Sequence, residues 1–291
     1  MTAGTELRVD LHLHTTASDG VLTPAALIAA VADGGVGLCA VTDHDTIEGL
    51  PEAGAAADAL GVRLVAGVEL STLWSGRTLH VLGLGIDPGS PDLSTLLALL
   101  GEARHARARA IAARLDRAGA PGGAILEHLR DLRIVTRTHF ARELVARGHA
   151  RDAGAAFSRW LARGQPGYAA AGWPELAPTI DAIRAAGGVA VLAHPLRYKL
   201  SAGQRRTLVK EFARLGGTGM EVVTGGQSPT QTETAVGLCL RAGLEGSQGS
   251  DCHDPSLPWQ RPGRLAKLAP AIVPVWHRWQ ADLVAAPAST A

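Results

Sequence analysis

The chain has 291 residues, enough for one barrel of ordinary size or two smaller domains. Its formal net charge of +1 excludes a strongly basic or acidic surface, so any affinity for nucleic acid or phosphate has to come from a local site. Apolar residues make up 46% of the chain and aromatic residues only 4%, which predicts a globular core of Ala, Val and Leu.

The cysteines and the start of the chain bear on its compartment. Cys39, Cys239 and Cys252 lie far apart and form no CxxC pair, which argues against a disulfide framework and for a reducing environment. Met1–Arg8 lacks the basic and then apolar regions of a secretory signal. No stretch approaches the roughly 18 apolar residues of a membrane span. We therefore expect a cytoplasmic protein without membrane attachment.

Short apolar runs alternate with helical patterns along most of the chain. The predicted strands are Leu7–Thr15, Val36–His44, Val62–Ser71, Thr78–Ile86, Gly188–Pro195, Gly219–Thr224 and Leu244–Asp251. The predicted helices between them are Pro24–Asp33, Ile47–Leu60, Thr179–Ala186, Gln204–Leu215 and Thr230–Ala242, the first with Thr23 as its N-cap. This alternation predicts an α/β fold with parallel strands. Seven strands favour a closed or nearly closed β/α barrel, with an open doubly wound sheet as the alternative.

One region breaks the alternation. Between about Leu93 and Trp173 the patterns are helical, at Leu93–Ala118, Thr138–Arg147 and Ala153–Ala162, with no convincing strand. We predict that residues 93–173 form a helical insert over one end of the barrel. Residues 1–92 and 174–291 would then form the barrel core.

Histidines and carboxylates recur where the predicted strands end. His12 and His14 are two apart in one strand, so both imidazoles project from the same face. The others are Asp19, His44, Glu69, His80, His194, Asp251 and His253. A single histidine in a strand is more often structural, but six strands contribute such groups, and active sites form at the carboxyl ends of parallel strands. Imidazoles and carboxylates without thiolates favour Mn²⁺, Zn²⁺ or Fe²⁺ over Mg²⁺.

The same residues resemble the PHP (polymerase and histidinol phosphatase) family, through Asp10-Leu-His-Leu-His14, Ser18-Asp19-Gly20, Thr42-Asp-His44-Asp45, Gly67-Val-Glu69, His80, His194-Pro195 and Ser250-Asp-Cys-His253. The resemblance implies a distorted (β/α)₇ barrel with three metal ions, manganese first, iron or zinc as alternatives. The implied ligands are His12, His14, Glu69 and Asp251 for one ion, Asp19, His44 and His253 for a second, and Glu69, His80 and His194 for a third. The first set would also be catalytic, by holding the ion that activates water. Some relatives have histidine in place of Asp19.

Two further aspartates flank a predicted ligand. Asp43 and Asp45 lie on either side of His44, where they could orient imidazoles. Asp45 could equally cap the helix predicted to begin at Ile47.

The predicted insert contains a candidate phosphate site. Arg137 and His139 stand at the start of a helix, where backbone N–H groups and a guanidinium favour an anion, although a solvated helix start is the simpler alternative. With Phe157, Arg163-Gly164 and His194–Leu200, this segment resembles one PHP branch, RNase AM and the 3′,5′-nucleotide bisphosphate phosphatases. That resemblance implies phosphate binding by Arg137 and His139, with Arg197 as a third contact. Gln165 and Cys252 depart from the Lys and Phe common in that branch.

The branch implies removal of the 3′-phosphate from nucleoside 3′,5′-bisphosphates and 5′-to-3′ trimming of short 5′-phosphorylated RNA. Trp74, Tyr198 or Trp259 could stack on a base, although each could simply be packed. The alternatives are a histidinol phosphatase and a nucleotide-binding module without turnover. The near-neutral charge predicts no stable binding of long nucleic acid.

Overall fold

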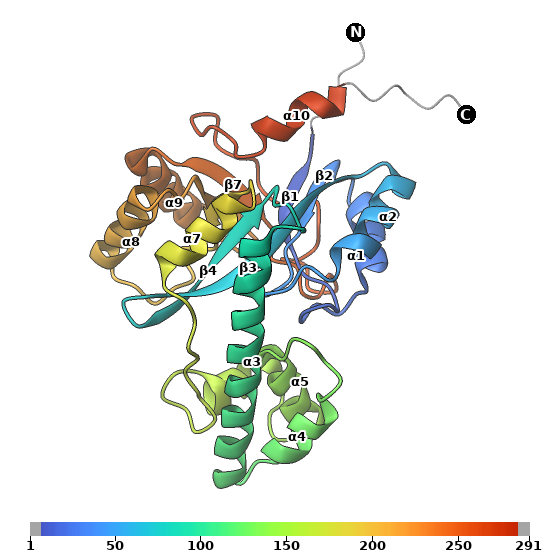
Figure 1. Ribbon diagram of the computed structural model, residues 1–291, viewed down its shortest axis with the longest axis vertical. Coiled ribbons are helices and arrows are strands. Elements are labelled where there is room, and N and C mark those ends of the chain that lie inside the picture. Colours follow the sequence, from blue (N-terminus) through green and yellow to red (C-terminus); the bar gives the residue numbers. More distant parts are fainter. Residues whose placement is uncertain (1–6, 285–291) are drawn as a thin grey trace.

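The computed structural model describes residues 7–284 and is organised by a mixed sheet of seven strands (Figure 1). The strands are β1 Val9–Leu13, β2 Leu38–Val41, β3 Arg63–Trp74, β4 Arg77–Leu84, β5 Val189–Leu192, β6 Gly219–Thr224 and β7 Glu245–Gly249, in that spatial order. All seven predicted strands are confirmed. The segment after β7 bonds back to β1, where the amide of Asp251 donates to the His12 carbonyl at 2.9 Å. The sheet therefore nearly closes into a barrel, as predicted, and is not an open doubly wound sheet.

The prediction of uniformly parallel pairing is wrong for β4. It pairs antiparallel with both β3 and β5, whereas the other neighbouring strands are parallel. The cause is the two-residue connection Ser75-Gly76, in which both residues have positive φ, 48° and 68°. Such a turn closes a hairpin and is far too short for a crossover between parallel strands. This hairpin is what distorts the barrel.

Helices cover the outside of the sheet. Helices α1 (Pro24–Asp33) and α2 (Leu50–Leu60) flank one side, and α7 (Leu176–Ala185), α8 (Ala202–Arg214) and α9 (Pro229–Ala242) flank the other (Figure 1). Helix α1 has the predicted bounds because the Thr23 hydroxyl accepts from the Ala26 amide and Pro24 occupies the first turn. Helix α10 (His277–Val284), which the sequence patterns did not predict, lies at the end of the barrel remote from the remaining helices.

Those remaining helices form a group beyond the barrel: α3 (Pro91–Arg117), α4 (Gly122–His128), α5 (Arg137–Ala146), α6 (Ala153–Ala156) and the π-helical turn η1 (Phe157–Leu161). The sequence patterns missed α4. The group has its own apolar core, which includes Ile111, Phe140 and Trp160. Helix α3 joins this core to the barrel core, because Leu93 and Leu100 at its start pack among barrel residues. The boundaries at 92/93 and 173/174 stay a prediction.

The cysteines and the helices bear on the compartment in which the protein is expected. Cys39, Cys239 and Cys252 are all free thiols and all buried, as expected of a chain without a disulfide framework. Within residues 7–284, no helix is long and apolar enough to cross a membrane. The start of the chain, on which the absence of a secretory signal was judged, lies mostly outside the described residues.

Candidate metal centre

All nine predicted ligands meet at one end of the barrel. His12 belongs to β1, and His14 and Asp19 follow it; Glu69 belongs to β3 and His80 to β4. The others follow strands: His44 after β2, His194 after β5, and Asp251 and His253 after β7. His80 reaches the cluster although β4 is antiparallel, because the hairpin register sets it opposite Ser71, two residues beyond Glu69.

Glu69 lies at the middle of this cluster. Its side chain is fully buried, and five imidazole nitrogens lie 2.9 to 3.3 Å from one or other of its oxygens. They belong to His12, His14, His44, His80 and His194. Burial opposes ionisation of Glu69, but His80, His44 and His12 outweigh it and hold the pKa of this carboxyl well below its usual range. One carboxylate on β3 therefore connects imidazoles from four other strands or their ends, β1, β2, β4 and β5.

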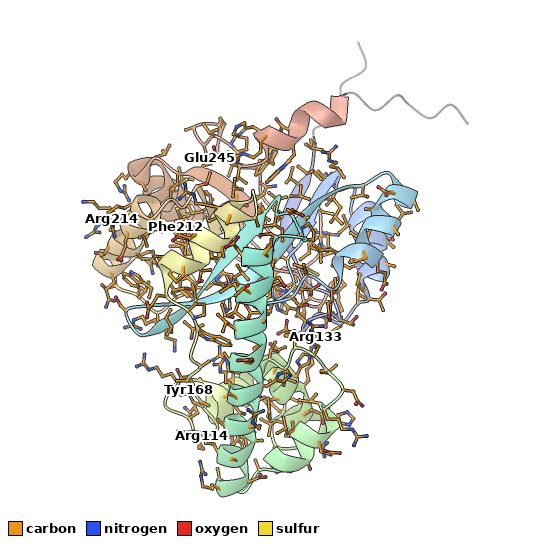
Figure 2. All side chains as sticks on the ribbon, viewed as in Figure 1. Arg114, Arg133, Tyr168, Phe212, Arg214 and Glu245 are labelled. Atoms are coloured by element: carbon orange, nitrogen blue, oxygen red, sulfur yellow. The ribbon has the colours of Figure 1, made fainter. Side chains whose placement is uncertain are left out.

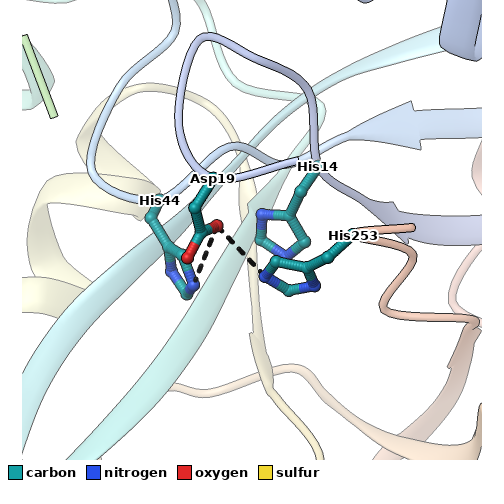
Figure 3. A group of neighbouring side chains, drawn as sticks. All are labelled: His14, Asp19, His44 and His253. Atoms are coloured by element: carbon teal, nitrogen blue, oxygen red, sulfur yellow. Dashed lines mark ion pairs between the residues drawn. The ribbon is translucent and has the colours of Figure 1, made fainter. Parts of the chain in front are cut away.

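The cluster divides into three groups whose ligand atoms lie within 4.8 Å of one another. The first is His12, His14, Glu69 and Asp251, which matches the set implied for one ion. The second is Asp19, His44 and His253, with His14 in addition (Figure 3). The third contains His44, Glu69 and His80. His194, implied for this third ion, lies 3.0 Å from the same Glu69 oxygen that faces His80.

The side chains of the cluster suit divalent cations. Seven of its polar atoms are buried and have no hydrogen-bond partner among the described residues: His12 Nε2, His14 Nδ1, Asp19 Oδ1, His44 Nδ1, Glu69 Oε2, His80 Nδ1 and His194 Nδ1. Buried polar atoms without partners are costly, and cations would satisfy those that face the cluster. Cys252 is not part of the set, because burial raises the pKa of its thiol to about 12 and its side chain packs among apolar residues.

Glu221 on β6 supports this centre and was missed by the sequence analysis. Its Oε1 lies 3.0 Å from His12 Nδ1, and its Oε2 accepts the backbone N–H of His194 at 2.6 Å. The carboxylate thus favours a proton on Nδ1 of His12 and leaves Nε2 for Glu69 and Asp251. Gly249 makes room for this arrangement, since a Cβ there would lie 2.2 Å from the Cβ of His12.

Asp43 and Asp45 have other roles than those predicted. Asp43 accepts hydrogen bonds from the backbone and hydroxyl of Thr15 and from the hydroxyl of Ser18, so it fixes the loop that carries Asp19. Asp45 accepts from the Ser71 amide and pairs with Arg104 at 2.6 Å. Neither hydrogen-bonds an imidazole in the described part of the chain, and the N-cap of α2 is Gly49 rather than Asp45.

Arg137 and His139 both lie on the first turn of α5, as predicted. His139 Nδ1 accepts the backbone N–H of Thr136 at 3.1 Å, and burial lowers the pKa of its imidazole to about 4. The ring is therefore neutral at pH 7, with its proton on Nε2. The guanidinium of Arg137 lies 5.7 Å from the ring centre of Phe157.

Arg107 on α3 is a second cation beside Arg137 that no motif pointed to. It is buried, and its Nε donates to the carbonyl of Ala169 at 3.0 Å. Burial and the nearby charges of Arg137 and Arg104 lower the pKa of Arg107 to about 9. Arg107 and Arg137 pair with no carboxylate among the described residues, whereas Arg104 pairs with Asp45. Arg107 is buried and Arg137 half-buried, and cations withdrawn from water without anionic partners indicate an anion-binding site.

The third predicted phosphate contact lies at another edge of the centre. Arg197 pairs through Nη1 with Asp251 and donates through Nη2 to the carbonyl of Gly225 at 2.9 Å.

The three aromatic residues that could stack on a base differ in exposure. Trp74 is buried and its indole N–H donates to Glu211. Tyr198 accepts the amide of His80 through its hydroxyl. Trp259 is 54% exposed and lies against Gly226, beside the loop that holds Arg197.

Fold and centre together define a barrel protein with a cluster of histidines and carboxylates that could hold metal ions. The model of the PHP domain matches residues 10–129. A 5′-3′ exoribonuclease of Haemophilus influenzae is 40% identical over 275 residues, which cover 94% of this chain and 99% of the relative. A 3′,5′-nucleoside bisphosphate phosphatase of Chromobacterium violaceum is 38% identical over 278 residues, 95% and 98% of the two chains.

Solved structures agree. A C. violaceum protein described as an amidohydrolase, with bound sulfate and no metal, has a TM-score of 0.89 at 38% identity over 94% of this chain and 96% of that one. A Bifidobacterium adolescentis protein proposed to be a metal-dependent phosphoesterase has a TM-score of 0.76 at 28% identity over 92% and 93%. The chain belongs to the PHP family, and the resemblance on which its sequence was interpreted is confirmed.

Divalent ions should stabilise the folded protein. Ions that bind the assembled cluster and not the unfolded chain add roughly 2.7 kcal/mol at a free concentration of 100 Kd. We expect the melting temperature of chelator-treated protein to rise on titration with Mn²⁺. The rise should be much smaller in a His12→Ala, His14→Ala double variant. An equal rise in both proteins would place the stabilising ions outside this cluster.

Glu221→Gln should weaken metal binding, because the amide carries no charge to support the Nδ1 proton of His12. Loss of such a supporting partner typically lowers metal affinity about 10- to 100-fold. Competition with a fluorescent chelator would measure the affinity. Glu245→Gln on the adjacent strand is the control, since Glu245 pairs with Arg278 instead. Unchanged affinity in Glu221→Gln would refute the supporting role.

Proposed function

We propose that this protein is a metal-dependent phosphoesterase that removes the 3′-phosphate of nucleoside 3′,5′-bisphosphates and trims short 5′-phosphorylated RNA from its 5′ end. Both reactions cleave a phosphoester on the 3′ side of a nucleotide that bears a 5′-phosphate. One site for that phosphate and one hydrolytic centre therefore serve both. The observation that carries the proposal is the pair of arginines without a carboxylate partner, Arg107 and Arg137, of which Arg137 lies on the helix that also contacts Asp19 of the metal cluster.

The metal cluster would hold up to three divalent ions on the three groups described, manganese first, with iron or zinc as alternatives. Bound ions supply Lewis acidity that activates water and neutralises charge on the phosphoryl group. His12, His14, Glu69 and Asp251 would hold the ion nearest the reaction. Asp19, His44 and His253 would hold the second ion, and Glu69, His80 and His194 the third.

The 5′-phosphate would lie at the start of α5. There Arg137 and Arg107 supply positive charge, and the neutral His139 donates from Nε2. The N-terminus of α5 adds backbone N–H groups of the same polarity. Arg197, which pairs with Asp251, would donate to the phosphate that is cleaved. A substrate with two phosphates on one ribose would then span the distance between the two cation sites.

Arg137→Ala should lower kcat/KM for adenosine 3′,5′-bisphosphate while leaving the metal content intact. A lost charge-assisted hydrogen bond costs about 1.5–3 kcal/mol, which corresponds to roughly a 10- to 150-fold decrease. Phosphate release with Mn²⁺-loaded protein is the assay. Arg133→Ala is the matched control, since Arg133 is exposed at the junction of insert and barrel and pairs with Glu48 (Figure 2). If Arg137→Ala showed the same kinetics as Arg133→Ala, the proposed phosphate site on α5 would be refuted.

Trp259 offers a test of the RNA half of the proposal. Its exposed indole lies against Gly226, in the loop whose Gly225 carbonyl accepts a hydrogen bond from Arg197. There it could stack on the base that follows the cleaved bond. We expect Trp259→Ala to weaken binding of a 5′-phosphorylated trinucleotide by about 1–3 kcal/mol, without effect on the bisphosphate, which has no second base. Equal effects on the two substrates would exclude this stacking role.

The alternatives are distinguished by the same assay. A histidinol phosphatase would use the same metal centre but has no 5′-phosphate for Arg107 and Arg137. Faster hydrolysis of histidinol phosphate than of the bisphosphate would overturn the proposed substrate. A binding module without turnover would release phosphate from neither compound.

The proposal includes action in the cytoplasm, because the three buried free thiols fit a reducing compartment.

A further inference from the structure

Helix α5 contacts the metal ligand Asp19 at two points. The hydroxyl of Thr136 lies 2.7 Å from Asp19 Oδ2, and Arg142 Nη2 donates to the backbone carbonyl of Asp19 at 2.8 Å. Thr136 and Asp19 are 6% and 1% exposed, so water competes little for these bonds. Asp19 is thus held by the helical group as well as by its own loop.

The two oxygens of Asp19 have separate partners. Oδ1 faces the cluster, 3.1 Å from His253 Nε2 and 3.9 Å from His44 Nε2 (Figure 3). Oδ2 accepts from the Thr136 hydroxyl at 2.7 Å. The Thr136 bond fixes the rotation of the carboxylate and so keeps Oδ1 pointed at the ion site.

Thr136 also belongs to the start of α5. As its N-cap, the hydroxyl accepts the amide of Thr138 at 3.1 Å, and the backbone N–H of Thr136 donates to His139 Nδ1 at 3.1 Å. A hydroxyl has a single proton, and here it is directed to Asp19, because an ionised carboxylate can only accept and its Oδ2 lies nearer, at 2.7 Å, than His139 Nδ1 at 3.5 Å. One residue is therefore bonded to a ligand of the metal cluster and to a residue of the candidate phosphate site.

We propose that Thr136 is a positioning residue that couples the 5′-phosphate site to the ion held by Asp19, His44 and His253. A phosphate on Arg137 and His139 orders the first turn of α5, and that turn orders Asp19. By linkage, the ion must strengthen phosphate binding by the same factor. The coupling rests on the proposed function, whereas the positioning of Asp19 stands without it.

The positioning is tested by Mn²⁺ stoichiometry and affinity, measured by calorimetric titration of the metal-free full-length protein. Thr136→Val removes the donor, so we expect one of the bound ions to weaken by about 10- to 100-fold while the others are unchanged. Thr136→Ser keeps the hydroxyl and should bind as the unaltered protein does. Thr138→Val, two residues along the same turn, is the matched control.

A further variant separates the bond to Asp19 from helix capping. Glycine is tolerated at an N-cap at a cost of a few tenths of a kcal/mol but cannot donate to Asp19. Thr136→Gly should therefore lose the same ion as Thr136→Val. Normal binding by Thr136→Gly, or an equal loss in Thr136→Ser, would overturn the proposal, because the effect would then come from capping or packing.

The coupling is tested by repeating the titrations with adenosine 5′-monophosphate. We expect the nucleotide to tighten the weakest Mn²⁺ site more in the unaltered protein than in Thr136→Val. Equal tightening would overturn the coupling, since the phosphate would then act on the ion directly. Failure of the nucleotide to bind either protein would overturn the coupling and the proposed substrate together. A lost ion in Thr136→Val would in that case still support the positioning role.

Discussion

The centre depends on burying one negative charge among imidazoles. Glu69 is removed from water completely, and its ionised form is stable only because imidazoles from the ends of neighbouring strands face both oxygens. Those imidazoles in turn have buried nitrogen atoms without a hydrogen-bond partner among the described residues, which a bound cation would satisfy. His12 extends this mutual dependence, because its Nε2 faces both Glu69 and Asp251 while its Nδ1, on the opposite side of the ring, faces Glu221. The order of the strands thus determines which side chains meet in the centre and could bind a metal ion together.

The helical group supplies what the barrel lacks. The barrel gathers the carboxylates and imidazoles of the centre, whereas two of the three arginines proposed to bind substrate phosphates, Arg107 and Arg137, come from α3 and α5. Arg104 connects the two parts, because it pairs with Asp45 and Ser71, each of which adjoins or follows a metal ligand. Charge separation between the two parts explains why a chain of net charge +1 can contain a site with strong local fields.

Much of the site could be predicted from the sequence because its ligands stand in regular places. Strand side chains alternate, and strand ends converge, so His12, His14 and their counterparts were expected to meet. The antiparallel direction of β4 does have a signal in the sequence, the pair Ser75-Gly76, which suits a two-residue hairpin turn. Glu221 had a signal in hindsight, a carboxylate inside an otherwise apolar buried strand. Arg107 and Thr136 have no such signal in the sequence, since their roles depend on how α3 and α5 pack on the barrel.

Helix α3 links the unfolding of the barrel to the unfolding of the helical group. At 27 residues it is about 40 Å long, and its first turns pack in the barrel core while its last turns pack in the core of the helical group. Arg104 is buried where the helix passes between them. Separating the two parts would require breaking a continuous helix and exposing an ion pair to water. The two cores should therefore unfold together as one cooperative unit.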